Sequence, residues 1–320
     1  MRRIIILLFL ILLIPSCEKN EVFSRTELRM DTLCTISVYT RKDEALLDQA
    51  FEIIDSASVM IDMYDSESEI SRVNSMASAE PVAVSDELFS LLMKAYDVSE
   101  YTDGAFNLAI GPLVALWGIG GENARLPSEA EIAKVLPLLD WHDIILDESG
   151  KTVFFKKEGM RIDLGGVGKG YIADLIAEMF RESGTESALI NLGGNVYGLG
   201  TKSDGEPWKV GLQDPFSEHG GYFTTISCSD ASVVTSGGYE RHFIAEDGKV
   251  YHHLLEWKTG YPASSDIISS TIISSDSTLS DMLSTACFVL GSERAEAVVD
   301  HYGVSALFLL EDGSIERIRI

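Results

Sequence analysis

Basic residues are scarce in this sequence. Lysine and arginine number 25 against 50 aspartates and glutamates, which gives a formal net charge of −25 over 320 residues. A surface of that sign repels nucleic acid, so we expect no nucleic-acid partner. An anionic ligand would need a bound cation or a local positive pocket to bind here.

Cysteines and several familiar catalytic motifs are also missing. Of four cysteines, Cys34, Cys228 and Cys287 lie beyond the first twenty residues, among apolar or small neighbours, and three cannot form a complete disulfide set. We expect all three to be buried small hydrophobes. No G-x-S-x-G, H-E-x-x-H, C-x-x-C or EF-hand pattern occurs, so serine hydrolase, zinc protease and thiol redox functions lack support.

Only one long apolar run is present, and it lies at the N-terminus. "MRR" precedes the eleven residues 4–14, which are too short to span a bilayer and typical of a signal peptide. The run ends in "IPSC", which resembles the processing box of bacterial lipoproteins. We therefore expect a signal peptide over 1–16, lipid on Cys17 and a tether over 17–27, with a mature charge of −27 because Arg2 and Arg3 are removed. The alternatives are an ordinary signal peptide and an uncleaved anchor.

The remaining sequence predicts a mixed fold. Apolar residues recur at helical spacing or alternate as in strands, without a sustained β–α–β rhythm, and this favours an α+β domain over a doubly wound parallel sheet. Helices are expected at 43–63, 85–104, 127–139, 170–184, 279–292 and 292–303, and strands or hairpins at 35–40, 143–157, 161–164, 187–200, 209–215, 223–237, 267–277 and 305–320.

A glycine-rich loop, "IDLGGVGKGYIAD", occupies residues 162–174. It fails the Walker A pattern because Asp163 stands where the first glycine belongs and Gly170 stands where Ser or Thr would bind magnesium. Gly168, Gly170 and Ala173 match a dinucleotide fingerprint, which alone is weak evidence. A helix beginning near Tyr171 would still offer backbone N–H groups to an anion, so we expect contact with a phosphate. The alternative is a tight turn that packs a helix on a sheet.

Other residues suggest partners for such a phosphate. Asp281 and Thr285 share one helix face, and their oxygens suit magnesium, although an aspartate near a helix start is usually a cap. His252 and His253 point to opposite faces of a strand, so only one can face a given site. A Ser-Gly-Gly turn at 236–238 is followed by Arg241, and Tyr64 can stack on a flat ring, although a core tyrosine is the alternative.

Taken in order, eight stretches resemble the ApbE family, the FAD:protein FMN transferases. The resemblance runs from about residue 28 to the C-terminus and rests on "MDT", "YDSESEISRVN", "GAFN…GPLVALWG", "DLGGVGKGYIAD", "NLGGN", "SGGYER", "HLLEWKTGYP" and "DMLSTA". It implies one catalytic domain over 28–320 with a mixed, largely antiparallel sheet and packed helices. It also implies an enzyme that transfers FMN from FAD to a Ser or Thr hydroxyl of an acceptor protein, with magnesium as cofactor, and releases AMP.

The resemblance also implies roles for individual residues. His253 corresponds to a histidine that can activate the acceptor hydroxyl, and magnesium is expected on Asp281, Thr285 and the backbone carbonyl of Gly168, where the family usually has alanine. The residues expected to bind FAD are Met30, Tyr64, Asp163, Gly165, Gly166, Lys169, Asp174, Ser236, Gly237 and Arg241.

Some positions depart from the family pattern. Glu256-Trp257 replaces the usual Asp-Pro, Asn195 and Gly238 replace frequent polar residues, and Asp31 replaces a frequent glycine. None removes the metal ligands or the histidine, so an active enzyme is expected.

The resemblance further implies flavin-bearing respiratory subunits of the Rnf or sodium-pumping NADH:quinone reductase (Na+-NQR) kind as acceptors. Together with the lipid on Cys17, it implies a bacterial membrane-anchored lipoprotein facing the periplasm or the outer side of the cytoplasmic membrane. Two other functions stay open: an FAD pyrophosphatase that uses water and gives FMN and AMP, and a flavin-binding lipoprotein without turnover.

Overall fold

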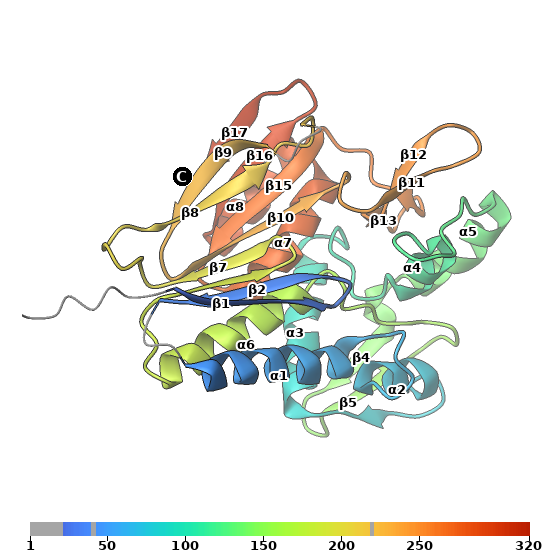
Figure 1. The fold of residues 1–320 in the computed structure, drawn as a ribbon. Coiled ribbons are helices and arrows are strands. Elements are labelled where there is room, and N and C mark those ends of the chain that lie inside the picture. The colour runs from blue at the N-terminus through green and yellow to red at the C-terminus, as the bar shows by residue number, and fades with distance from the viewer. Residues whose placement is uncertain (1–21, 40–42, 218–220) are drawn as a thin grey trace, which may run out of the picture.

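A computed structural model of the chain describes residues 22–39, 43–217 and 221–320 (Figure 1). Its centre is an eight-stranded sheet in the order β1-β2-β6-β7-β10-β15-β16-β17, in which all neighbours pair antiparallel. The strands are β1 Phe23–Arg29, β2 Thr32–Val38, β6 Ala188–Leu192, β7 Asn195–Leu199, β10 Ala231–Gly237, β15 Ile267–Ser274, β16 Ser305–Leu310 and β17 Ile315–Ile318. The antiparallel sheet with packed helices confirms the predicted α+β class.

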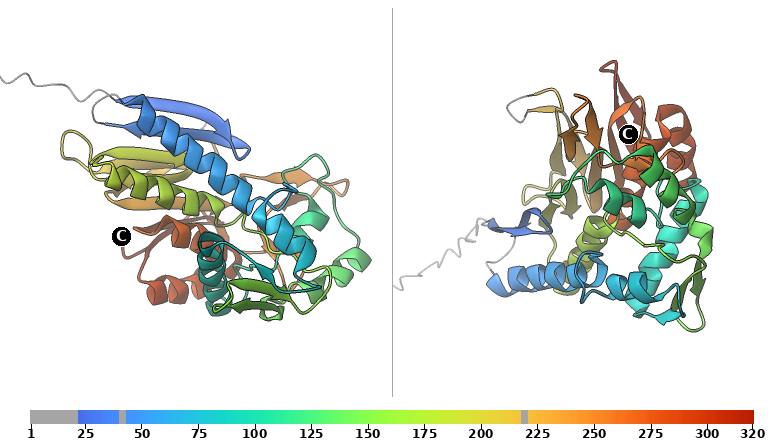
Figure 2. Two further views of the ribbon diagram at one scale, coloured as in Figure 1. Left: turned by 90° about the horizontal axis from the view of Figure 1, so that it is seen from below. Right: turned by 90° about the vertical axis from the view of Figure 1, so that its right-hand side faces the viewer.

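Helices cover one face of the sheet (Figures 1 and 2). They are α1 Glu44–Ile61, α6 Gly168–Glu182, α7 Ser277–Leu290 and α8 Ser292–Tyr302, and α3 Asp86–Tyr101 packs against α7. Buried side chains of α1 and α6, such as Ile54 and Ile176, form one core with Ile36 and Ile190 of the sheet. The helices and the sheet therefore bury each other's apolar faces, which is the main favourable term in folding.

On another side, two strands form a separate ladder. β8 Trp208–Gln213 pairs with β9 Tyr222–Cys228, and Trp208 and Ile226 pack on Val233 and Leu307 of the large sheet. The sheet thus has apolar partners besides the helices.

The remaining helices and strands are short and lie outside the large sheet. They are the helices α2 Glu69–Met76, α4 Gly111–Trp117 and α5 Glu129–Val135, the 3-10 turns η1 Leu136–Leu138 and η2 Trp141–Asp143, and the strands β3 Val82–Ala83, β4 Ile144–Asp147, β5 Thr152–Phe155, β11 His242–Ile244, β12 Val250–His252, β13 Leu255–Glu256 and β14 Tyr261–Pro262. Strands β3, β5 and β4 form one small sheet, and β11–β12 and β13–β14 are two-stranded ladders.

Most predicted elements are confirmed, with shifted ends. Asp43 caps α1 through Ala45 N, and Ser85 caps α3, but α3 ends at Tyr101 rather than at Gly104. The helix expected over 127–139 becomes 3-10 from Leu136 onward, next to a proline that lacks an N–H group. The helix after the glycine loop begins at Gly168, before the start near Tyr171 that the sequence predicts.

Two predictions were wrong. Residues 23–27 do not belong to a tether, because β1 pairs them with β2, for example Arg25 with Ile36. Residues 161–164 form no strand. There Asn74 of α2 donates from Nδ2 to the Ile162 carbonyl at 2.9 Å and accepts from Ile162 N at 2.7 Å, so an amide side chain takes the place of a neighbouring strand.

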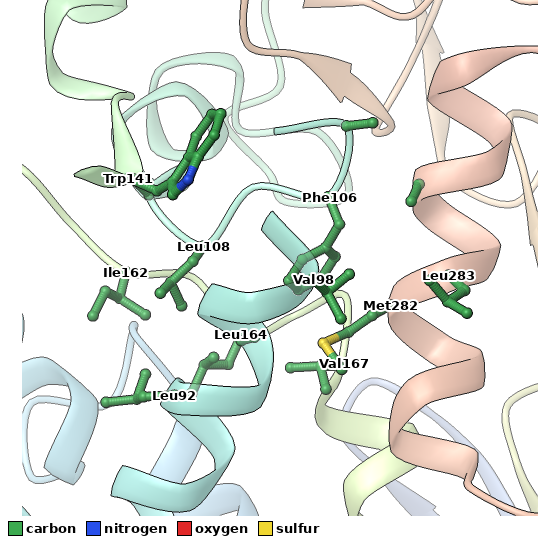
Figure 3. Close-up of a cluster of buried hydrophobic side chains, with 14 of the residues drawn as sticks. Leu92, Val98, Phe106, Leu108, Trp141, Ile162, Leu164, Val167, Met282 and Leu283 are labelled. Carbon is green, nitrogen blue, oxygen red and sulfur yellow. The ribbon is translucent and has the colours of Figure 1, made fainter. Parts of the chain in front are cut away.

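Buried apolar side chains on one side of the segment hold the glycine loop in place (Figure 3). Ile162, Leu164 and Val167 are buried and point into a core with Met282 of α7. The intervening Asp163, Gly165 and Gly166 are thereby left on the other side of the segment.

The three cysteines within the described residues are free and buried, as predicted. Burial raises the pKa of Cys228 to about 11 and that of Cys287 to about 12. Within residues 22–39, 43–217 and 221–320, no helix is long and apolar enough to cross a membrane. The expected signal peptide 1–16 and the lipid-bearing Cys17 lie outside the described residues.

Candidate active site

The site is built where the first turns of α6 and α7 cross. A Cβ at Gly170 would lie 2.3 Å from the carbonyl oxygen of Ser277 and 2.8 Å from Cβ of Asp281. Glycine is therefore what lets the two helices approach so closely. The crossing brings Asp281 to the loop that precedes α6.

Each helix then supplies a carboxylate to the first turn of the other. Gly170 N donates to Asp281 Oδ2 at 2.8 Å. In return Asp174 of α6 accepts from the backbone of Ser277 at 2.9 Å and of Thr278 at 2.8 Å, and from the Thr278 hydroxyl at 2.6 Å. Carboxylates at helix N-termini satisfy free N–H groups and stabilise the ends. The predicted FAD ligand Asp174 is thus engaged in holding α7 in place.

Asp281 is a buried carboxylate among polar groups. It is 5% exposed. Burial raises its pKa, and the charge of Lys169 is the largest opposing influence, followed by the bond from Gly170. Beside it lies Asn195, whose buried Nδ2 makes no close hydrogen bond among the described residues and whose side-chain amide helps to lower the pKa of Asp281. A buried carboxylate is a place where a cation would lower the free energy.

Thr285 lies one turn further along α7. Its Oγ1 is 3.4 Å from Oγ of Ser236 at the end of β10, and a Cβ at Gly166 would lie 3.7 Å from it. The glycine loop, Ser236 and the expected metal ligand therefore meet. Phe106 closes this side, because its ring would lie 3.3 Å from the same Cβ.

Lys169 supplies the positive charge. It is half-buried and forms no hydrogen bond or ion pair with another residue that the structure describes. Its charge nevertheless acts on both Asp281 and His253. The charge of the predicted lysine therefore reaches both the expected metal ligand and the expected histidine.

His253 is held as a neutral imidazole with a defined tautomer. Its Nδ1 lies 3.1 Å from the carbonyl oxygen of Arg241, so Nδ1 carries the proton and donates, and Nε2 keeps its lone pair. Burial lowers the pKa of His253 to about 4, and the charges of Arg241 and Lys169 act in the same direction. His252 instead packs edge-on against Phe288 with ring centroids 5.4 Å apart, in line with the expected alternation of the two histidines.

The flavin side of the site would be formed by the outer atoms of the glycine loop. Asp163 accepts from Gly165 N at 2.6 Å; burial raises its pKa and the charge of Arg241 lowers it. The charge of Asp163 also reaches Tyr64, which is 71% exposed and therefore free to stack on a ligand ring. Arg241 itself is exposed and serves the site chiefly through the carbonyl that holds His253.

Met30 occupies a hairpin turn at the edge of the same region. Met30 and Asp31 have φ values of 52° and 56°, a conformation that glycine adopts most readily. A Cβ at Gly193 would lie 2.3 Å from Thr32 Oγ1, so this turn touches the glycine pair just before Asn195. A Cβ at Gly237 would meet the ring of Tyr239 at 2.4 Å, and the Gly237 carbonyl accepts from Glu240 N at 3.3 Å.

The unusual Glu256-Trp257 pair joins two loops. Trp257 Nε1 donates to the Asp103 carbonyl at 3.0 Å, and Lys258 Nζ pairs with Asp103 Oδ2 at 2.5 Å. The indole also packs edge-on against Trp141 at 5.3 Å, over Gly104. Glu256 accepts from Thr259 Oγ1 at 3.0 Å. These contacts tie the segment after His253 to the one before Phe106.

The oxygen donors fit magnesium better than a softer metal. Within the described ranges, no group of three or more His, Cys, Asp or Glu side chains could hold a metal ion. Asp281, Thr285 and the Gly168 carbonyl instead offer a carboxylate, a hydroxyl and a carbonyl, the hard oxygen ligands that magnesium takes alongside water and phosphate. A Cβ at Gly168 would meet only the side-chain end of Ile61, at 2.6 Å.

Sequence reasoning missed four contributors. Asn74 clamps the entry to the glycine loop, Phe106 lies against it, and Asn195 faces Asp281. Glu240 is exposed; partial loss of hydration raises its pKa, the charge of Lys169 lowers it and that of Asp281 raises it, so this carboxylate lies within reach of both charges. All four lie in stretches that carry the family resemblance, but no spacing rule connects them.

Comparison with known proteins identifies the family of this chain. The sequence model of the ApbE family matches residues 30–308. The chain is 38% identical over 297 residues to a FAD:protein FMN transferase of Klebsiella pneumoniae, covering 92% of each, and 35% identical to one of Treponema pallidum, covering 93% of this chain and 89% of the other.

Solved structures give the same result. The crystal structure of the ApbE protein from Thermotoga maritima superimposes with a TM-score of 0.86 at 33% identity, covering 93% of this chain and 97% of that one. The flavin transferase ApbE from Vibrio cholerae gives a TM-score of 0.83 at 25% identity, covering 93% and 96%. The α+β fold is thus that of a known class of flavin transferases. This chain belongs to the ApbE family.

Proposed function

We propose that this protein is a magnesium-dependent FAD:protein FMN transferase that esterifies FMN to a Ser or Thr hydroxyl of an acceptor protein and releases AMP. The relatives named above carry that activity in their names. The observation that carries the proposal is the crossing of α6 and α7, which joins the buried carboxylate of Asp281 to the glycine loop through Gly170 N at 2.8 Å. The charge of Lys169 acts on Asp281 and on the neutral imidazole of His253, which the Arg241 carbonyl holds. Cation, metal ligand and base are the parts that phosphoryl transfer requires.

Binding of FAD is assigned to the loop and its surroundings. The exposed Tyr64 offers a ring for the isoalloxazine, and Lys169 with the first turn of α6 offers positive charge to the pyrophosphate. Asp281, Thr285 and the Gly168 carbonyl would hold magnesium. When bound, magnesium neutralises charge on the phosphoryl oxygens and on the departing AMP.

The acceptor hydroxyl is assigned to His253 Nε2. Because Nδ1–H is engaged by the Arg241 carbonyl, only Nε2 can take the hydroxyl proton. The acceptor oxygen forms its bond to the phosphorus on the flavin side, and the bond from that phosphorus to the bridging oxygen breaks. AMP leaves with that oxygen and the electron pair, and the proton passes from His253 to solvent.

We further propose that acceptors are subunits of the Rnf or Na+-NQR kind, and that the protein is anchored outside the cytoplasm by lipid on Cys17. These proposals rest on the family resemblance and on the N-terminal "IPSC". Globomycin sensitivity of processing, with labelled palmitate on wild-type protein and none on a Cys17→Ala variant, tests the anchor. Cleavage without lipid would refute it.

Hydrolysis of FAD is the competing reaction, because Nε2 of His253 would serve water as well as a hydroxyl. Incubation of the purified protein with FAD and Mg2+, with and without an acceptor peptide, separates the two. Mass spectrometry of the peptide should show one added FMN and AMP in equal amount. Free FMN released equally in both tubes, with no adduct, would overturn transferase function in favour of the pyrophosphatase.

A further inference from the structure

Two pairs of buried serines join β10 to α7, one helical turn apart. Ser232 lies 3.0 Å from Ser280, and Ser236 lies 2.7 Å from Ser284, measured between Oγ atoms. Three of the four are fully buried, and Ser236 is 8% exposed. The two pairs have the same spacing in the chain, but only the second touches Thr285.

The single proton of each hydroxyl sets a direction in the second pair. Ser284 donates to the Asp281 carbonyl at 2.9 Å, since a carbonyl can only accept. Its proton is therefore used, and Ser236 must be the donor in the Ser236–Ser284 bond. The proton of Ser236 is then used as well, so the longer contact to Thr285 at 3.4 Å has Thr285 as its donor.

We propose that Ser236 and Ser284 are positioning residues that orient the Thr285 hydroxyl for magnesium. This relay turns the hydroxyl proton of Thr285 toward Ser236 and leaves the lone pairs of Oγ1 for the ion. A cation repels a hydroxyl hydrogen, so a threonine without this acceptor must reorient before it can bind metal. Groups that orient metal ligands in this way commonly change metal affinity by ~10–100-fold when removed.

This role differs from the direct FAD contact that the sequence predicts for Ser236. The hydroxyl of Ser236 has both of its contacts on α7, with Ser284 and Thr285. The inference rests on the metal site of the proposed function, and it concerns only the affinity of that site.

The test is direct binding of Mn2+ alone to the purified protein, followed by the loss of the free-ion signal in electron paramagnetic resonance. We expect Ser236→Ala and Ser284→Ala each to raise the dissociation constant about tenfold. The double variant should be no weaker than the weaker single variant, because either change breaks the same relay.

Ser232→Ala and Ser280→Ala are the matched controls. They remove the same kind of buried hydroxyl from the same interface, where Ser280 donates to the Asp276 carbonyl at 3.0 Å and no metal ligand is touched. Their Mn2+ affinity should equal that of the wild type even where thermal unfolding shows an equal loss of stability.

Three results would overturn the relay: a wild-type protein that binds no Mn2+, controls that lose as much affinity as Ser236→Ala, or fully additive losses in the double variant. Transfer of FMN by the wild type is measured separately. A protein that binds Mn2+ and shows the relay but transfers no FMN would refute the proposed function and leave this inference standing.

Discussion

The close crossing of α6 and α7 makes Gly170→Ala the most informative substitution. The added methyl group would lie 2.3 Å from the Ser277 carbonyl oxygen and 2.8 Å from Cβ of Asp281. Favourable contacts lie at about 3.5–4.0 Å, so α7 must retreat by roughly 1 Å. It cannot do so freely, because Asp174 holds its first turn through three hydrogen bonds.

The expected cost follows from two opposing effects. Overpacking of this kind costs about 1–3 kcal/mol, and replacing glycine by alanine in a helix returns up to about 1 kcal/mol. We expect the free energy of unfolding to fall by about 1–2 kcal/mol. Because the bond from Gly170 N to Asp281 is displaced as well, metal affinity and FMN transfer should fall with it.

Gly168→Ala is the matched control, two residues away in the same helical turn. Its methyl group meets only Cδ1 of Ile61, at 2.6 Å, and that side-chain end can rotate away. Stability, metal affinity and activity should stay near wild type. Urea unfolding, Mn2+ titration and AMP release measure the three quantities. A Gly170→Ala protein as stable and active as Gly168→Ala would refute the close crossing of the helices.

Three other changes have defined outcomes. His253→Asn should abolish FMN transfer. In the wild type, the His253 pKa of about 4 should place the acid limb of the kcat/KM profile below pH 6.5, the ordinary pKa of histidine. An acid limb near pH 6.5 would contradict this assignment. The unfolded chain takes up this proton first, so stability should fall as pH drops from about 6.5 to about 4, an effect that His253→Asn removes in urea titrations. Trp257→Phe keeps an aromatic ring but loses the hydrogen bond to the Asp103 carbonyl. In steady-state assays it should therefore raise KM for the acceptor more than it lowers kcat. A loss in kcat alone would argue that Trp257 does not position the loop. Asp174→Asn should lower the free energy of unfolding in urea by about 1–2 kcal/mol, as the loss of a helix cap does. FAD binding at saturating Mg2+ should persist. Loss of FAD binding in a folded Asp174→Asn protein would instead support direct contact between Asp174 and FAD.

Much of the fold follows from local patterns in the sequence. The helices capped by Asp43 and Ser85, the hairpin over 143–157 and the strands on either side of Gly193-Gly194 are visible as periodicity with stop signals. The strand predicted at 161–164 is wrong because the backbone of Ile162 bonds to the side chain of Asn74, 88 residues away, and not to another strand. Local pattern cannot reveal a pairing of that kind.

The site shows a similar limit. The glycine loop predicts an anion site, and Asp281 with Thr285 predicts oxygen ligands for a metal. Only the family resemblance indicates that these two segments meet, because Gly170 and Asp281 are 111 residues apart. Even with the resemblance, the sequence indicates which residues lie at the site better than which groups they contact. Asp174 holds α7, and Arg241 contributes a carbonyl where its charged group was expected.

The central claim is that this site breaks FAD and keeps its FMN half on a protein. The most direct measurement is intact-mass spectrometry of an acceptor domain of the Rnf or Na+-NQR kind after incubation with the protein, FAD and Mg2+. The account predicts one FMN added at a single Ser or Thr, one AMP released for each adduct, and neither with His253→Asn or without Mg2+. An acceptor that stays unmodified while FAD stays intact, or an adduct that forms equally with His253→Asn, would contradict it.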